Sequence, residues 1–159
     1  MPLKTVGRTL TSEQINSVNQ TTLQQTIHDT IPLSQHMGFS INSLSDQHIQ
    51  VSAPLSSNVN IHGTAFAGSI YAVATLTAWA LAYYTLRSVG SGADLVLGEG
   101  NIKYKAPIKG DLNCRATLTD AERTEFLQRL SEKGRSRLVL KVDINNAAYW
   151  EGKLRAVQR

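Results

Sequence analysis

The feature that most constrains this chain is a long stretch without carboxylate, lysine or arginine side chains. Between Asp46 and Arg87 the sequence contains no Asp, Glu, Lys or Arg. Within this stretch, residues 65–86 have the length of a helix of about six turns. They are apolar on nearly every side, and a helix that is hydrophobic all round lies in a protein core or in a membrane. The fold must therefore cover this helix on several sides at once.

The surrounding sequence favours a protein core over a membrane. A membrane span needs about twenty predominantly apolar residues. Alanine is the commonest apolar residue here, and small or polar residues lie within the segment or directly before it: Thr64, Gly68, Ser69, Thr75, Thr77 and Thr85. Alternating strand-like patterns also lie on both sides of it. We therefore expect a buried helix and no membrane span.

Alternating apolar and polar residues before the helix indicate half-buried strands. One alternation runs through Met37, Phe39 and Ile41, and a second runs from Ile49 to Leu55. Ser45 and Asp46 lie between them and are typical turn residues. The two segments are therefore predicted to form an antiparallel hairpin.

After the helix the pattern is strand-like to the end of the chain. Four segments alternate, at residues 95–106, 112–118, 138–144 and 148–156. The phase of the first slips across residues 98–100, which predicts a β-bulge or a sharp bend. Asp120 is predicted to cap a short helix that runs to Lys133 and stops at Gly134. Asn145 and Asn146 are predicted to form a tight turn.

These elements predict the fold class α+β. Two strands, one long buried helix and four further strands fit an antiparallel sheet that covers the helix on one face. One sheet cannot cover every side of so apolar a helix, so a partner subunit is expected on the remaining side. We expect this domain to span residues 35–159.

The first 34 residues are predicted to be an arm followed by a helix that packs on the domain. Thr11 with Gln14 three residues later forms a capping box, which predicts a helix start. A thin apolar stripe continues from Ile15 to Ile31, and Pro32 is predicted to stop this helix.

Composition narrows the function. The net charge is +4 and no basic run occurs, so neither nucleic-acid binding nor a polybasic membrane anchor is indicated. Cys114 is the single cysteine, which excludes an internal disulfide. His28, His36 and His48 have no metal-ligand spacing with a nearby carboxylate, so no metal is expected. Without a signal-peptide pattern, a cytoplasmic location is expected.

The segment 58–69 carries the residues suited to chemistry. Gly63 and Thr64 precede the predicted helix, whose first turn has unpaired N–H groups and partial positive charge. Such groups can hold a carbonyl oxygen as it becomes an oxyanion. Small residues then follow one stripe of the helix, which fits either a tunnel wall for an acyl chain or a close packing seam: Gly68, Ala72, Thr75, Ala78 and Ala82.

Two motifs resemble a known family. Asn60, Gly63-Thr64, Phe66 and Gly68-Ser69, followed by Leu76 and Trp79, resemble the hotdog-fold thioesterases of the YiiD C-terminal domain type. Tyr104-Lys105-Ala106-Pro107 and Gly110-Asp111 resemble the hotdog strand that ends in an aromatic, a basic residue, Pro and a Gly-Asp turn. The resemblance covers residues 35–157. It implies a hotdog fold, a homodimer or dimer of dimers, and hydrolysis of an acyl thioester carried by coenzyme A or acyl carrier protein. No separate cofactor is implied, since coenzyme A or phosphopantetheine belongs to the substrate.

The resemblance assigns roles to specific residues, and this chain departs from the broader superfamily at two of them. Phe66 stands where that superfamily has His, and Thr75 stands where it has Asp. The catalytic candidates are therefore Asn60, His62, Gly63, Thr64 and Thr75. For each there is a structural alternative: Asn60 as a turn residue, His62 as an exposed loop histidine, and Thr64 as a helix cap.

Substrate-binding candidates follow from the same motifs. Phe66, Gly68 and Ser69 lie at the helix start, and Trp79 would lie beside the acyl chain. Lys103 and Lys105 could meet the phosphates of coenzyme A, or they could be ordinary outward strand residues, as could Lys109. Asp94 and Glu99 are carboxylates after the helix, and a solvated surface explains them equally well.

The missing acid at position 75 keeps other functions open. A non-catalytic acyl or acyl-CoA binding module would retain the pocket without needing a base. A hydratase or dehydratase on the same fold would need a His paired to a carboxylate; His62 could supply the first, and no acid on the helix supplies the second.

Overall fold

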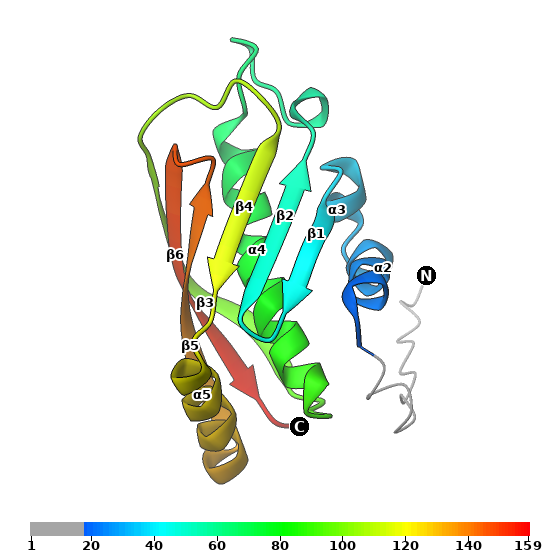
Figure 1. Ribbon diagram of the computed structural model, residues 1–159, viewed down its shortest axis with the longest axis vertical. Helices are drawn as coiled ribbons and strands as arrows, with labels where there is room; N and C mark the ends of the chain where they lie inside the picture. Colours follow the sequence, from blue (N-terminus) through cyan, green and yellow to red (C-terminus); the bar gives the residue numbers. More distant parts are fainter. Residues whose placement is uncertain (1–17) are drawn as a thin grey trace, which may run out of the picture.

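The computed structural model describes residues 18–159. An antiparallel six-stranded sheet has the order β1-β2-β4-β5-β6-β3 and curves around one long helix, α4 (Figure 1). The strands are β1 (Ser40–Ser45), β2 (His48–Ala53), β3 (Asp94–Tyr104), β4 (Leu112–Thr117), β5 (Arg135–Ile144) and β6 (Ala148–Val157). The helices are α2 (Gln20–Thr30), α3 (Pro32–His36), the short 3-10 turn η1 (Leu55–Ser57), α4 (Ala67–Ser88) and α5 (Asp120–Lys133). This is the hotdog arrangement that the sequence predicts.

Helix α4 is buried against the inner face of the sheet. Its side chains Val73, Ala80, Leu81 and Leu86 are fully buried. They meet the alternating inward residues of the strands in one continuous core, as the strand patterns predict. Among the described residues, no helix has the length and hydropathy of a membrane span.

Helix α4 is not covered on every side. A stripe of partly exposed residues runs down it through Tyr71, Thr75, Trp79 and Tyr83. These positions are four residues apart, so they share one face of the helix. The stripe is the side for which the sequence analysis expects a partner subunit.

The predicted details of the later strands are confirmed. The β3–β6 register shifts between Leu97 and Glu99, so a bulge lies where the apolar phase slips. Asn145 and Asn146 form the turn between β5 and β6 with positive φ angles, and Gly134 ends α5 in the left-handed conformation. The predicted cap of α5 is wrong by one residue, because Thr119 is the N-cap and forms a capping box with Glu122.

The prediction of one helix from Thr11 to Ile31 is wrong. Helix α2 begins at Gln20, because Asn19 has extended backbone and its side chain caps the helix. Thr11 and its capping box lie outside the described residues. The predicted stop at Pro32 is confirmed, because α2 ends at Thr30 with Ile31 as its C-cap. Pro32 itself occupies the first turn of α3, where its missing N–H needs no partner. Leu23 and Ile27 of α2 are buried in the same core as the sheet.

Candidate functional site

A tight loop holds the start of α4. The backbone N–H of Asn60 donates to the carbonyl of Thr64 at 2.7 Å, and Val59 pairs with Ala65 as an isolated bridge. The N–H groups of Ala65 and Phe66 donate to the carbonyls of Ile108 and Asn58, at 2.8 and 2.7 Å. The loop is therefore fixed at both ends before the helix begins.

The side chain of Asn60 organises this loop. Its Oδ1 accepts from the N–H groups of His62 (2.8 Å) and Thr64 (3.1 Å), and its Nδ2 donates to the Thr64 hydroxyl (2.8 Å) and the Ala65 carbonyl (3.3 Å). Both donor protons and both acceptor sites of the amide are thus used within the loop. His62 and Gly63 are exposed at the loop tip, beside Ile61, which is 95% exposed.

Helix α4 begins at Ala67, two residues later than the sequence predicts. The N-cap is Phe66, with no side-chain capping bond, so the prediction that Thr64 caps the helix is wrong. Thr64 instead belongs to the hydrogen-bonded loop. The N–H groups of the first turn, at Ala67, Gly68 and Ser69, precede the first helical bond, from Ile70 N–H to the Phe66 carbonyl, and have no partner within the helix.

The Phe66 ring lies across this first turn. The side chain is 54% exposed, and a Cβ on Gly68 would approach its ring to 2.6 Å. Gly68 thus gives room to Phe66, and the ring shields part of the helix start from solvent. Ser69 is partly buried beside it.

Two tyrosines that the site prediction missed fasten α4 to strand β3. The Tyr104 hydroxyl donates to the Ala67 carbonyl at 2.8 Å. Burial raises the pKa of this phenol, and the neighbouring Tyr71 raises it further. A Cβ on Gly100 would lie 2.2 Å from the Tyr71 hydroxyl, so the glycine allows that ring to lie against β3. The period-four spacing of Tyr71 with Thr75 and Trp79 is the sequence signal that could have found it.

Thr75 is two turns down the helix from this start. Its Oγ1 is buried and has no hydrogen-bond partner among the described residues. Trp79 follows one turn later, donates from Nε1 to the Leu95 carbonyl at 3.0 Å, and stacks on Tyr83 with ring centroids 4.7 Å apart. Within one protomer the structure therefore brings Asn60, Thr64, Phe66, Gly68 and Ser69 together, and it keeps Thr75 and Trp79 apart from them.

The stripe of small residues divides between two environments. Ala78 and Ala82 are fully buried in the core, as a packing seam requires. Gly68, Ala72 and Thr75 are at least partly exposed on the uncovered face of α4. Only the first half of the stripe is therefore free to line a channel.

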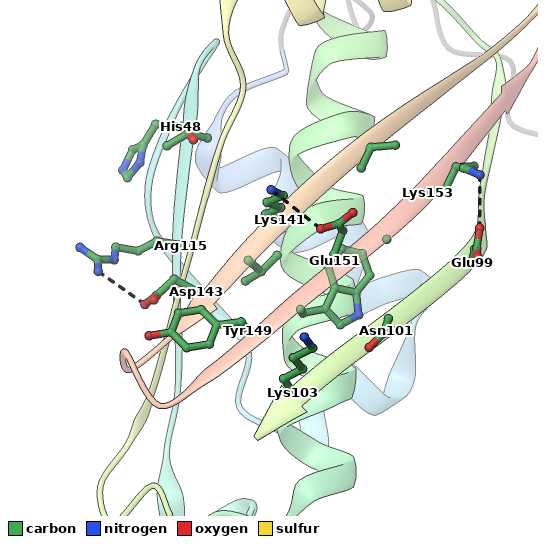
Figure 2. Close-up of a pocket in the computed structure, with 15 residues that line it drawn as sticks. His48, Glu99, Asn101, Lys103, Arg115, Lys141, Asp143, Tyr149, Glu151 and Lys153 are labelled. Carbon is green, nitrogen blue, oxygen red and sulfur yellow. Dashed lines mark hydrogen bonds and ion pairs between the residues drawn. The ribbon is translucent and has the colours of Figure 1, made fainter. Parts of the chain in front are cut away.

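Lys103 lies on the other face of the sheet. Figure 2 shows it in a broad cleft of about 1040 Å³ on the outer face, away from α4. Cross-strand ion pairs line this cleft: Arg115–Asp143 at 3.5 Å, Lys141–Glu151 at 3.9 Å and Lys153–Glu99 at 3.2 Å. Lys105 is exposed just beyond β3, and its N–H bonds the Ala147 carbonyl. Asp94 is paired with Arg159, whose hydrogen bond lowers the pKa of that carboxyl.

Comparison with known proteins identifies the family. The model of the family described as "Putative thioesterase (yiiD_Cterm)" matches residues 20–154. The chain belongs to this family. The crystal structure of a protein described as a putative thioesterase from Shewanella oneidensis is 32% identical, covers 87% of this chain and 96% of its own, and superposes with a TM-score of 0.79.

Two further structures extend the likeness. A protein of unknown function from Chlorobaculum tepidum TLS is 27% identical over 94% of this chain and 98% of its own, with a TM-score of 0.85. A thioesterase from Haemophilus influenzae is 14% identical over 95% of this chain and 93% of its own, with a TM-score of 0.61. At that identity the likeness shows the hotdog fold alone.

Proposed function

We propose that this chain hydrolyses an acyl thioester of coenzyme A or acyl carrier protein to the free acid and the thiol. The observation that carries the proposal is the start of α4, where the unpaired N–H groups of Ala67, Gly68 and Ser69 follow a rigid loop. Membership of the thioesterase family supports it. Such N–H groups stabilise an oxyanion when they are held in place before the reaction begins.

The reaction needs little beyond this anchor and an activated water. The water oxygen bonds to the thioester carbonyl carbon, and negative charge grows on the carbonyl oxygen facing the α4 amides. The C–S bond then breaks and the departing thiolate takes up a proton. His62 is the candidate base near the helix start that would take a proton from the water, and Asn60 accepts a hydrogen bond from the backbone N–H of His62.

We propose that the complete site forms between two copies of the chain. Strand β3 is an edge strand, and among residues 18–159 it pairs only with β6. The partly exposed stripe of α4 lies beside it, with the unpartnered Thr75 hydroxyl on that stripe. If two copies pair antiparallel through β3, the two-fold axis is perpendicular to the sheet, and both helices lie on one side. The Thr75 hydroxyl would then orient the attacking water at the joint.

An acyl-binding module without turnover is the second candidate, and one observation favours it. Helix α4 carries no carboxylate, although thioester hydrolases generally use one to attack the carbonyl or activate water. In such a module the helix start would hold the thioester carbonyl without cleaving the C–S bond.

A panel of acyl-CoA thioesters from acetyl to palmitoyl, together with acyl carrier protein substrates, tests these alternatives by release of free thiol. Burial raises the pKa of the Cys114 thiol to about 12, so the protein's own cysteine should not react quickly with the thiol reagent of the assay. We expect turnover, and a kcat at least about tenfold lower in Thr75→Val, which removes the hydroxyl and keeps the shape. Thr75→Ser is the matched control and should retain turnover.

The remaining outcomes separate the two candidates. Tight binding of a thioester without turnover would establish the acyl-binding module. Neither turnover nor binding with any thioester would overturn both. Because the Thr75 hydroxyl has no hydrogen-bond partner among residues 18–159, a loss of activity without a loss of stability would point to a role in the reaction.

A further inference from the structure

A shallow groove at the far end of the sheet from the α4 start is strongly basic. It has a volume of about 450 Å³ and lies between the C-terminal half of α5, the start of β5 and the end of β6. Its lining consists of Arg129, Lys133, Arg135, Ser136, Arg137, Lys153, Arg155, Ala156 and Val157. Six of these residues are cationic and none is acidic. We refer to this site as the basic groove.

Most of the cations in the basic groove have no acidic partner. Arg129 pairs with Glu125 at 2.9 Å and Lys153 pairs with Glu99 at 3.2 Å. Asp94, opposite Val157 in the register, is already paired with Arg159. The other four cations form no ion pair with any described residue: Lys133, Arg135, Arg137 and Arg155. In the neighbouring outer cleft, by contrast, three of the four cations pair with an acid: Arg115, Lys141 and Lys153.

Two of the unpaired cations oppose each other across the strands. Arg137 of β5 is directly opposite Arg155 of β6, and both are exposed on the outer face. Like charges in this position destabilise a sheet, and a guanidinium stays charged at any ordinary pH. The Arg155 side chain also extends over the bulge of β3, where a Cβ on Gly98 would meet its Nε at 2.6 Å. Both arginines line the basic groove, and an anion bound there would offset the repulsion among its cations.

We propose that the basic groove binds a phosphate-bearing small molecule. Several arginines in one groove favour phosphate, because the planar guanidinium donates two parallel hydrogen bonds to its oxygens. The phosphates could belong to a coenzyme A thioester or to a free nucleotide. In a dimer joined through β3, the two-fold axis would bring the α4 start of one protomer to the same end as the basic groove of the other. The groove proposal does not require that the chain hydrolyse thioesters.

Calorimetric titration with pyrophosphate, ADP and coenzyme A tests the proposal on the intact protein. We expect binding that weakens as salt rises. In the double variant Arg137→Gln/Arg155→Gln, binding should be roughly tenfold weaker or more, since two charged hydrogen-bond donors are lost. The matched control is Arg115→Gln/Lys141→Gln, which removes two cations that already have acidic partners and should bind as the wild type does.

Stability measurements test whether weaker binding by the groove variant could come from unfolding. Removing both charges of this like-charge pair should leave the groove variant as stable as the wild type or more stable, so weaker binding could not be attributed to unfolding. The phosphates belong to the substrate if two results hold. Coenzyme A must bind more tightly than ADP or pyrophosphate, and the groove variant must show a raised KM for acyl-CoA at unchanged kcat. Equal binding of ADP and coenzyme A without a KM effect assigns the groove to a free nucleotide.

Two outcomes would overturn the proposal. One is that pyrophosphate, ADP and coenzyme A all fail to bind. This outcome overturns the proposal even if an acidic carrier protein does bind. The other is that the control variant loses as much affinity as the groove variant. Because these titrations need no turnover, their failure is separate from a failure of the proposed hydrolase activity.

Discussion

The two edges of the six-stranded sheet end in different ways. At the β1 edge, side chains of α2 form hydrogen bonds with the strand backbone. Gln24 Oε1 accepts from the Ile41 N–H at 2.7 Å, and Gln20 Nε2 donates to the Ile41 carbonyl at 2.9 Å. At the β3 edge, Trp79 bonds the Leu95 carbonyl, and the long remainder of the strand is uncovered within the described residues.

This difference indicates where a second copy would join. An exposed edge presents unpaired N–H and C=O groups and is a template for pairing with another chain, so proteins cover or interrupt edges that must stay single. The β1 edge is short, bulged after Ile41 and covered by a helix. The β3 edge is long and lies next to the stripe of α4 that residues 18–159 leave uncovered, so one dimer interface would cover both.

The largest expected effect comes from adding charge to the open edge. Val96 and Asn101 are exposed on β3, so Val96→Lys/Asn101→Lys should leave the protomer folded. In a dimer joined through β3 the four added charges would repel each other. We expect a monomer by light scattering, and thioesterase activity lower by about tenfold or more, because charges on an edge strand block pairing.

The covered edge supplies the control for that experiment. Asn42→Lys/Ser45→Lys adds the same charge to exposed positions of β1 and should leave both assembly and activity unchanged. A wild-type protein that is monomeric, or a β3 variant that remains dimeric, would contradict the proposed joint.

A smaller effect is expected from uncovering the β1 edge. Gln24→Ala leaves the N–H of the buried Ile41 without its acceptor, which should cost about 1–2 kcal/mol in the free energy of unfolding. Urea denaturation measures it. Gln25→Ala is the control, because Gln25 bonds only the exposed Asp29. Assembly should not change in either variant; a new oligomer in Gln24→Ala would mean that β1 can also pair.

The smallest effect concerns the phenol that joins β3 to α4. Since the folded-state pKa of Tyr104 is raised above the usual 10.0, the folded protein holds this proton more tightly than the unfolded chain does. The resulting stabilisation is present below about pH 10 and is lost as the pH rises through the folded-state pKa. Tyr104→Phe should therefore flatten the alkaline fall in unfolding free energy. Tyr149→Phe, which removes the phenol that bonds the Asn146 carbonyl on the outer face, is the matched control.

Much of the fold follows from local pattern. The period-two alternation places each strand, and the phase slip at Gly98 locates the bulge, because a one-residue insertion reverses which face every later side chain occupies. Helix boundaries were harder. Threonine is a common helix cap, so Thr64 is a reasonable candidate. In the structure the Thr64 N–H donates to Asn60 Oδ1 within the loop instead. That bond depends on the loop conformation, which the spacing of residues in the sequence does not reveal.

The candidate site could be predicted only in part. The residues of the loop are close in sequence, so a motif can identify them together. The contacts of Tyr104 with Ala67 and of Tyr71 with Gly100 join segments far apart in the chain, and they follow from the sheet order. The opposition of Arg137 and Arg155 likewise depends on the β5–β6 register, which the turn at Asn145 and Asn146 sets.

The two tryptophans of this chain allow the proposed dimer interface to be followed by intrinsic fluorescence. Trp150 is buried in the core, so its emission should be insensitive to events at the surface. Trp79 is partly exposed on the uncovered stripe and stacks on Tyr83. The Arg87 guanidinium also lies over the Tyr83 ring, 4.2 Å from its centre. In a Trp150→Phe background, the fluorescence of Trp79 alone would follow subunit association or acyl-chain entry in real time, without any attached label.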